Sequence, residues 1–131
     1  MNKSERKELV QYRISRAYET LREVDFLIKH QLWNITVNRL YYACYYAVIA
    51  LLISKKIKAQ THAGVRQMFG LHFVKTGLID KELGSFFSNI FDKRLTGDYD
   101  DFIDYNKEDV LALIKPAKKF IHQIEELLKK K

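Results

Sequence analysis

The chain has 131 residues, of which 47% are hydrophobic and 30% charged, and a formal net charge of +7. We expect residues 1–131 to form a single domain, because this length is typical of one hydrophobic core. Cys44 is the only cysteine, which excludes an intrachain disulfide, and its apolar neighbours predict a buried, inert thiol. The charged N-terminus and the shortness of the longest apolar run predict a cytoplasmic protein that does not enter a membrane.

The first predicted helix covers residues 4–29, where apolar side chains recur at spacings of four and three residues and form one stripe. Ser4 gives an approximate N-cap signal for this helix. The second predicted helix covers residues 34–54 and is apolar on every side. A helix of that kind is surrounded by other helices, so we expect it to be the central element.

Three more helices are predicted in the second half of the chain. Thr61 can cap the third helix, which Gly77 ends, and Asp80 can cap a fourth helix that reaches about residue 91. The segment "RLTGDYDDFIDYN" is interpreted as a loop or broken helix. Asn106 can cap the fifth helix, in which we expect Pro116 to cause a kink. The sequence therefore predicts an all-α protein, a five-helix antiparallel bundle with up-and-down topology.

Four tyrosines lie in the central stretch "NRLYYACYYAVIALL", and a buried phenol needs a hydrogen-bond partner. We expect these rings to pack in the core, with their hydroxyls reaching the surface or a neighbouring helix. The alternative is that one or two of them, such as Tyr42, line a cleft in which a base stacks. The spacing of the tyrosines is compatible with both.

Three segments occur in a fixed order: "NRLYYA", "THAG" and "RLTGDY". With these motifs, residues 5–128 closely resemble the HEPN superfamily, in its small prokaryotic branch. The resemblance implies a helical bundle that forms a homodimer, often encoded beside a minimal nucleotidyltransferase as a toxin–antitoxin pair. Many HEPN toxins are metal-independent ribonucleases whose site is an arginine followed four to six residues later by a histidine, brought together across the dimer cleft.

The chain departs from that pattern at the histidine. Arg94 matches the family's arginine and could hold a phosphate bidentately. Asp98 and Tyr99 follow it, and no histidine occurs before His122. An ordinary aspartate is a weak base at neutral pH, and an ordinary tyrosine stays protonated. The resemblance therefore implies lost or altered nuclease chemistry, and it also makes Tyr99 a position where a nucleotidyltransferase could add a nucleotide.

Further candidate residues precede Arg94 in the chain. Asn38 and Arg39 open the buried stretch of the second helix, and we expect Arg39 to pair with Asp98 or a neighbouring carboxylate. His62 follows the predicted cap Thr61, where a neutral imidazole could accept a proton or bind phosphate; capping or packing is the simpler role. The four histidines share no metal-ligand spacing, so we expect neither a metal site nor a cofactor.

Our interpretation is a HEPN-like domain that acts as the dimeric partner of a minimal nucleotidyltransferase in a toxin–antitoxin or defence module. One alternative is a metal-independent endoribonuclease that uses Arg94 with Asp98 or His62. A second alternative is a nucleotide-binding sensor module. Whether the protein is an enzyme stays open at this stage. In each case the predicted cleft for nucleotide, RNA or a partner is the same; it contains Asn38, Arg39, Tyr42, His62 and Arg94.

Overall fold

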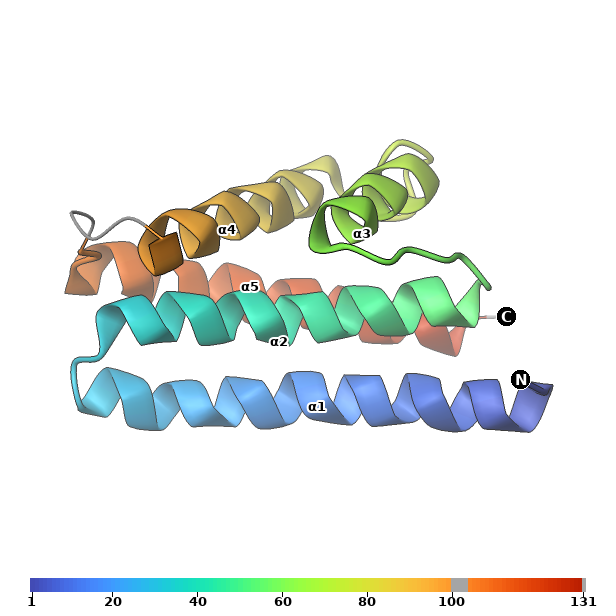
Figure 1. The fold of residues 1–131 in the computed structure, drawn as a ribbon, viewed down its shortest axis with the longest axis horizontal. Coiled ribbons are helices and arrows are strands. Elements are labelled where there is room, and N and C mark those ends of the chain that lie inside the picture. The colour runs from blue at the N-terminus through green and yellow to red at the C-terminus, as the bar shows by residue number, and fades with distance from the viewer. Residues whose placement is uncertain (100–103, 131) are drawn as a thin grey trace.

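The computed structural model describes residues 1–99 and 104–130, and for Tyr99 only its place at the end of a helix. Five α-helices and one π-helical turn lie in these ranges, and no strand does. This confirms the all-α prediction. Figure 1 shows α1 on one side of α2, α3 and α4 on the other, and α5 behind α2. The helices are α1 (Lys3–Lys29), α2 (Trp33–Ser54), α3 (His62–Phe69), η1 (Gly70–Val74), α4 (Lys81–Tyr99) and α5 (Lys107–Lys129).

The central position predicted for α2 is confirmed. It packs against α1, α3, α4 and α5, and half of its side chains are buried. By length and composition α2 could cross a membrane, but 61% of its apolar window is buried inside the bundle, as expected of a core helix. Cys44 is fully buried on α2, and burial raises the pKa of its thiol, which agrees with the predicted inert role.

Three helix starts differ in how well the sequence predicted them. Asn2 rather than Ser4 caps α1: its side chain accepts a hydrogen bond from the Glu5 backbone N–H at 2.8 Å, and the Glu5 carboxylate accepts from the Asn2 N–H. Thr61 caps α3 as predicted, by accepting from the Gly64 N–H at 2.9 Å. Asn106 caps α5 as predicted, and that helix continues unbroken through Pro116.

The main difference from the sequence prediction is the length of α4. This helix does not end near residue 91 but continues to Tyr99, so that Arg94 and Asp98 lie one turn apart on it. Tyr105 fixes the chain just beyond it. The Tyr105 hydroxyl donates to the backbone oxygen of Lys93 at 2.8 Å, and its backbone N–H donates to the Asn34 side chain at 2.8 Å. The end of α4 is therefore held beside the start of α2.

Candidate functional site

The site is built around Tyr41, which is fully buried on α2. Its hydroxyl lies 2.8 Å from Nδ1 of His62, the first residue of α3. The Arg94 guanidinium, from α4, lies 4.9 Å from the centre of the Tyr41 ring. Three helices therefore bring Tyr41, His62 and Arg94 together, although Tyr41 and Arg94 are 53 positions apart in the sequence.

Arg94 is one of the most buried charged groups among the described residues, with 7% of its side chain exposed. Its guanidinium also lies 5.8 Å from the Tyr42 ring and 6.0 Å from the Phe91 ring. It forms an ion pair with Asp98 at 3.6 Å, a loose contact for a carboxylate. Within the described ranges its Nε is buried with no hydrogen-bond partner. A buried donor of this kind favours an anionic ligand at the guanidinium.

Asn38, which was predicted only as a residue of the cleft, binds Asp98. The Asn38 side-chain amide donates to both Asp98 carboxylate oxygens, at 3.1 and 3.4 Å. Arg39 makes no direct pair with Asp98, one of the carboxylates predicted for it; the neighbouring Asp100 and Asp101 lie outside the described residues. Its guanidinium donates to the Asn38 side-chain oxygen at 3.0 and 3.1 Å and lies 3.9 Å from Glu23 on α1. Arg39 is therefore linked to Asp98 through Asn38, because it is the Asn38 side chain that contacts Asp98 on α4.

His62 lies among rings rather than in open solvent. Its imidazole stacks on Tyr45 at 4.3 Å between ring centres and meets the edge of Tyr42 at 5.7 Å. Burial lowers the pKa of His62 below 6.5, and the nearby positive charge of Arg94 lowers it further. The imidazole is therefore neutral at pH 7. Burial raises the pKa of Tyr41, so its hydroxyl stays protonated beside it.

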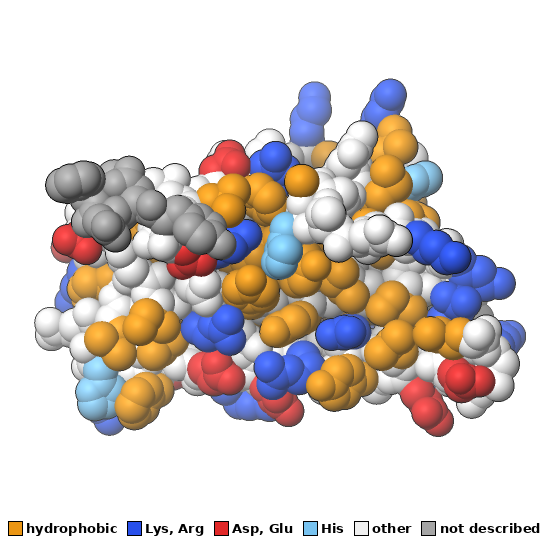
Figure 2. Space-filling view, viewed as in Figure 1, with side chains coloured by type: hydrophobic (Ala, Val, Ile, Leu, Met, Phe, Trp, Pro, Cys, Tyr) orange, Lys and Arg blue, Asp and Glu red, His pale blue; other side chains and the backbone are white. Residues whose placement is uncertain are grey.

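The four tyrosines at positions 41, 42, 45 and 46 of α2 differ in burial. Tyr41 is a core residue whose hydroxyl reaches a neighbouring helix, as expected. Tyr42, Tyr45 and Tyr46 are partly exposed, and arginines cover two of them: Arg39 lies 5.0 Å from the Tyr42 ring and Arg16 lies 5.4 Å from the Tyr46 ring. Figure 2 shows Lys and Arg side chains interspersed with hydrophobic and acidic ones over α1 and α2.

Tyr99 was predicted as a site residue, whereas a grouping of titratable side chains on α5 was not predicted. The side chain of Tyr99 lies outside the described part of the chain. A metal-like grouping of His122, Glu125 and Glu126 occurs on α5, with candidate ligand atoms within 4.8 Å of one another. These are neighbours along one helix face, and Glu125 already accepts a hydrogen bond from the Tyr18 hydroxyl at 2.8 Å. The grouping is explained by helical spacing and a contact between helices.

Comparison with known proteins places this arrangement in a family. The profile of the HEPN domain matches residues 10–127. A "UPF0332 protein" of Thermotoga maritima is 38% identical over 125 residues, 95% of each chain. Two proteins of Methanocaldococcus jannaschii are also similar. "Putative toxin MJ0605" is 33% identical over 98% of this chain and 95% of its own, and "Putative toxin MJ0142" is 32% identical over 88% and 78%. The chain belongs to the HEPN domain family.

Proposed function

We propose that this protein is the toxin-type HEPN component of a toxin–antitoxin or defence module, and that it cleaves RNA by an altered, metal-independent chemistry. The observation that carries this proposal is that Arg94 and His62 flank the same Tyr41 ring. An arginine and a neutral imidazole are what phosphodiester cleavage needs: one group for the phosphate charge and one for a proton. The names of the two archaeal relatives support the toxin role.

In this mechanism Arg94 binds the non-bridging oxygens of the scissile phosphate, which competes with its loose pair to Asp98. His62 takes the proton of the ribose 2′-hydroxyl, whose oxygen attacks phosphorus. The bond from phosphorus to the 5′-oxygen breaks, and that oxygen takes up a proton. The products are a 2′,3′-cyclic phosphate and a 5′-hydroxyl end, so the step consumes no water and no metal.

Tyr41 sets the tautomer of His62 in this scheme. A tyrosine hydroxyl can donate or accept, so the 2.8 Å contact is compatible with either protonation of Nδ1. When Nδ1 carries the proton and donates it to Tyr41, Nε2 is the free base. When Tyr41 donates instead, Nε2 carries the proton and can donate to a phosphate oxygen or the leaving 5′-oxygen. The Tyr41–His62 pair can therefore supply the base for the 2′-hydroxyl and the acid for the leaving 5′-oxygen.

The proposed partner is a minimal nucleotidyltransferase, with the HEPN chain as a cytoplasmic homodimer. The family resemblance supports this part, and the nucleotide would be added to Tyr99 beside the Arg94 site. Incubation with the cognate transferase and ATP should then increase the mass of the chain by one nucleotidyl group or more. Tyr99→Phe should abolish the increase, and Tyr12→Phe, which changes an exposed tyrosine on α1, should not.

The direct test of the proposed activity is incubation of the purified protein with total RNA and tRNA in EDTA. Wild type should produce fragments with 5′-hydroxyl ends, and Arg94→Lys should not, because lysine keeps the charge but loses the planar fork. Arg22→Lys, the same change at an exposed position on α1, is the matched control. Equal melting temperatures would show that Arg94→Lys folds. Absence of cleavage by wild type would overturn the proposed activity.

A further inference from the structure

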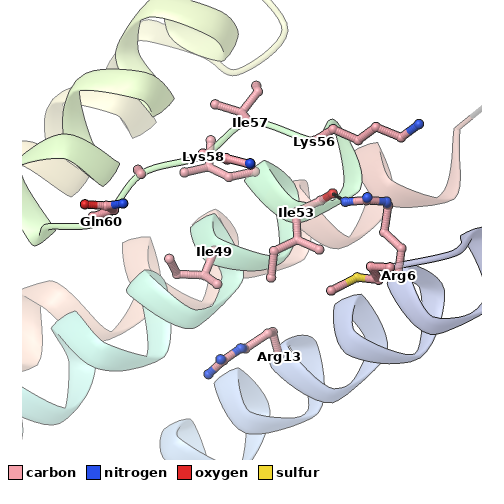
Figure 3. Close-up of a pocket in the computed structure, with 11 residues that line it drawn as sticks. Arg6, Arg13, Ile49, Ile53, Lys56, Ile57, Lys58 and Gln60 are labelled. Atoms are coloured by element: carbon pink, nitrogen blue, oxygen red, sulfur yellow. Dashed lines mark hydrogen bonds between the residues drawn. The ribbon is translucent and has the colours of Figure 1, made fainter.

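A second feature lies beyond the Arg94 cluster, where α1 begins and α2 ends. There a cavity of about 640 Å³, here called the basic cleft, opens between the two helices and the segment that follows α2. Arg6 and Arg13 line it from α1, and Lys56 and Lys58 line it from the connecting segment. In Figure 3 the Arg6 side chain is hydrogen-bonded to Ile53, and the Lys56 side chain extends outward at the rim of the cleft. Its volume is within the usual range for small-molecule and nucleotide sites.

Local backbone structure holds the basic cleft open. Lys56 has φ of 59°, which turns the chain back at the end of α2, and the Ile57 N–H donates to the Leu52 oxygen at 2.9 Å. Arg6 donates to the Ile53 oxygen at 3.1 Å and so joins the start of α1 to this turn. The segment 56–60 is thereby folded over the end of α2 and forms one wall.

The lining has one sign of charge and an apolar floor. Four cationic side chains line the cleft, and no acidic one does among the described residues. The Nε of Arg13 is buried without a hydrogen-bond partner within the same ranges. The apolar part of the lining consists of Met1, Ile49, Leu52, Ile53, Ile57 and Ala59. A ligand that satisfies both parts has phosphate at one end and a planar or weakly polar body at the other, as a nucleotide unit does.

The basic cleft lies close to the Arg94 cluster, both along the chain and along α2. Ala59 and Gln60 line it, and the next residues are the cap Thr61 and then His62. On α2, Ile49 lies one turn beyond Tyr45, the ring that stacks on His62. Ile49 therefore lies about 6 Å along the helix axis from Tyr45, at a rise of about 1.5 Å per residue. A neighbouring nucleotide of a bound strand can reach that far.

We propose that the basic cleft binds a nucleotide flanking the scissile phosphate of a single-stranded RNA, with its phosphate on the cations and its base or ribose on the apolar floor. This inference rests on the proposed function. It gives the altered site a strand path along α2, from Arg94 past His62 to Lys56. The nearness of the cleft to His62 favours an RNA strand over a free nucleotide of the same chemistry.

The test measures binding of a fluorescein-labelled, 2′-O-methyl single-stranded RNA by anisotropy across a salt series. Lys56→Gln/Lys58→Gln removes two exposed charges that make no ion pair among the described residues. It should raise Kd at least about 5-fold and reduce the slope of log Kd against log salt by about 1, since each phosphate contact on a single strand contributes roughly 0.7. Lys115→Gln/Lys119→Gln, which changes two exposed lysines of α5 outside the cleft, should match wild type.

The outcomes separate this inference from the function on which it rests. If Arg94→Lys abolishes cleavage while the Lys56/Lys58 variant binds RNA like its control, the cleft proposal alone is wrong. If AMP raises the melting temperature through Lys56 and Lys58 and RNA binding does not depend on them, the site takes a free nucleotide and the proposal is also wrong. If wild type neither binds nor cleaves RNA, both proposals fall.

Discussion

The folded structure lowers the pKa of His62. Its ordinary pKa of 6.5 is lowered in the folded protein by burial first and by the charge of Arg94 second. The unfolded chain therefore binds a proton at His62 in a pH range where the folded chain does not. Protonation in that range favours unfolding, so His62 costs stability as the solution is acidified.

This effect predicts how stability depends on pH. The free energy of unfolding should fall as pH decreases from about 6.5 to the lowered pKa of His62, and below that pKa this residue should add no further change. Urea unfolding at a series of pH values measures it. His62→Gln should reduce the slope in this window, whereas His72→Gln, which alters an exposed histidine of η1, should leave it unchanged. Identical slopes for wild type and His62→Gln would contradict this reading of the site.

At the level of single residues, the sequence supplied the members of the site better than their contacts. Arg94 and Asp98 were predicted from a motif, and His62 from its place after a cap. The link between His62 and Arg94 runs through Tyr41, whose hydroxyl was expected to reach a neighbouring helix but not to contact His62 in particular. A motif spacing has no information about which ring lies between two helices. The route from Arg39 to Asp98 through Asn38 was missed because it depends on side-chain direction.

At the level of elements, the helical periodicity predicted α1, α2 and α5 well, since each has a strong apolar pattern or a capping residue. The start of α3 was also predicted, but the third helix was expected to end at Gly77, whereas α3 ends at Phe69 and the π-helical turn η1 follows it to Val74. The error at α4 has a physical cause. "RLTGDY" contains glycine and few apolar residues, which favours a loop by local preference. Its tertiary contacts outweigh that preference, because Arg94 packs on the rings of α2 and Tyr105 holds the backbone at Lys93.

The packing of α4 against η1 gives a test at this scale. A methyl group at Gly84 would lie 2.7 and 2.8 Å from the two γ-carbons of Val74 and 3.3 Å from its Cβ, so rotating that side chain does not relieve the clash. Gly84→Ala should therefore destabilise the protein by about 1–3 kcal/mol despite the better helix propensity of alanine. Gly70→Ala, which meets open space, should be neutral or stabilising. Urea midpoints distinguish the two, and a stabilised Gly84→Ala would contradict the close packing.

At the level of the whole molecule, the family predicts a homodimer, and the exposed apolar side chains leave surface for one. Phe26, Leu32 and Ile35 are each more than 40% exposed and flank the turn between α1 and α2. Sedimentation equilibrium at micromolar protein should give twice the chain mass of 15.6 kDa. A mass that stays at 15.6 kDa at every concentration would contradict the predicted dimer. The dimer's geometry could not be predicted from one sequence, because several faces of the bundle are compatible with a twofold contact.

In the proposed function His62 replaces the histidine missing after Arg94, and the rate of RNA cleavage in EDTA tests this replacement. The initial rate on one labelled RNA should be measured for wild type, His62→Gln and His72→Gln. The account predicts that His62→Gln is slower by about 100-fold or more, with RNA affinity retained, and that His72→Gln equals wild type. Equal rates for the two variants, or no cleavage by wild type, would contradict it.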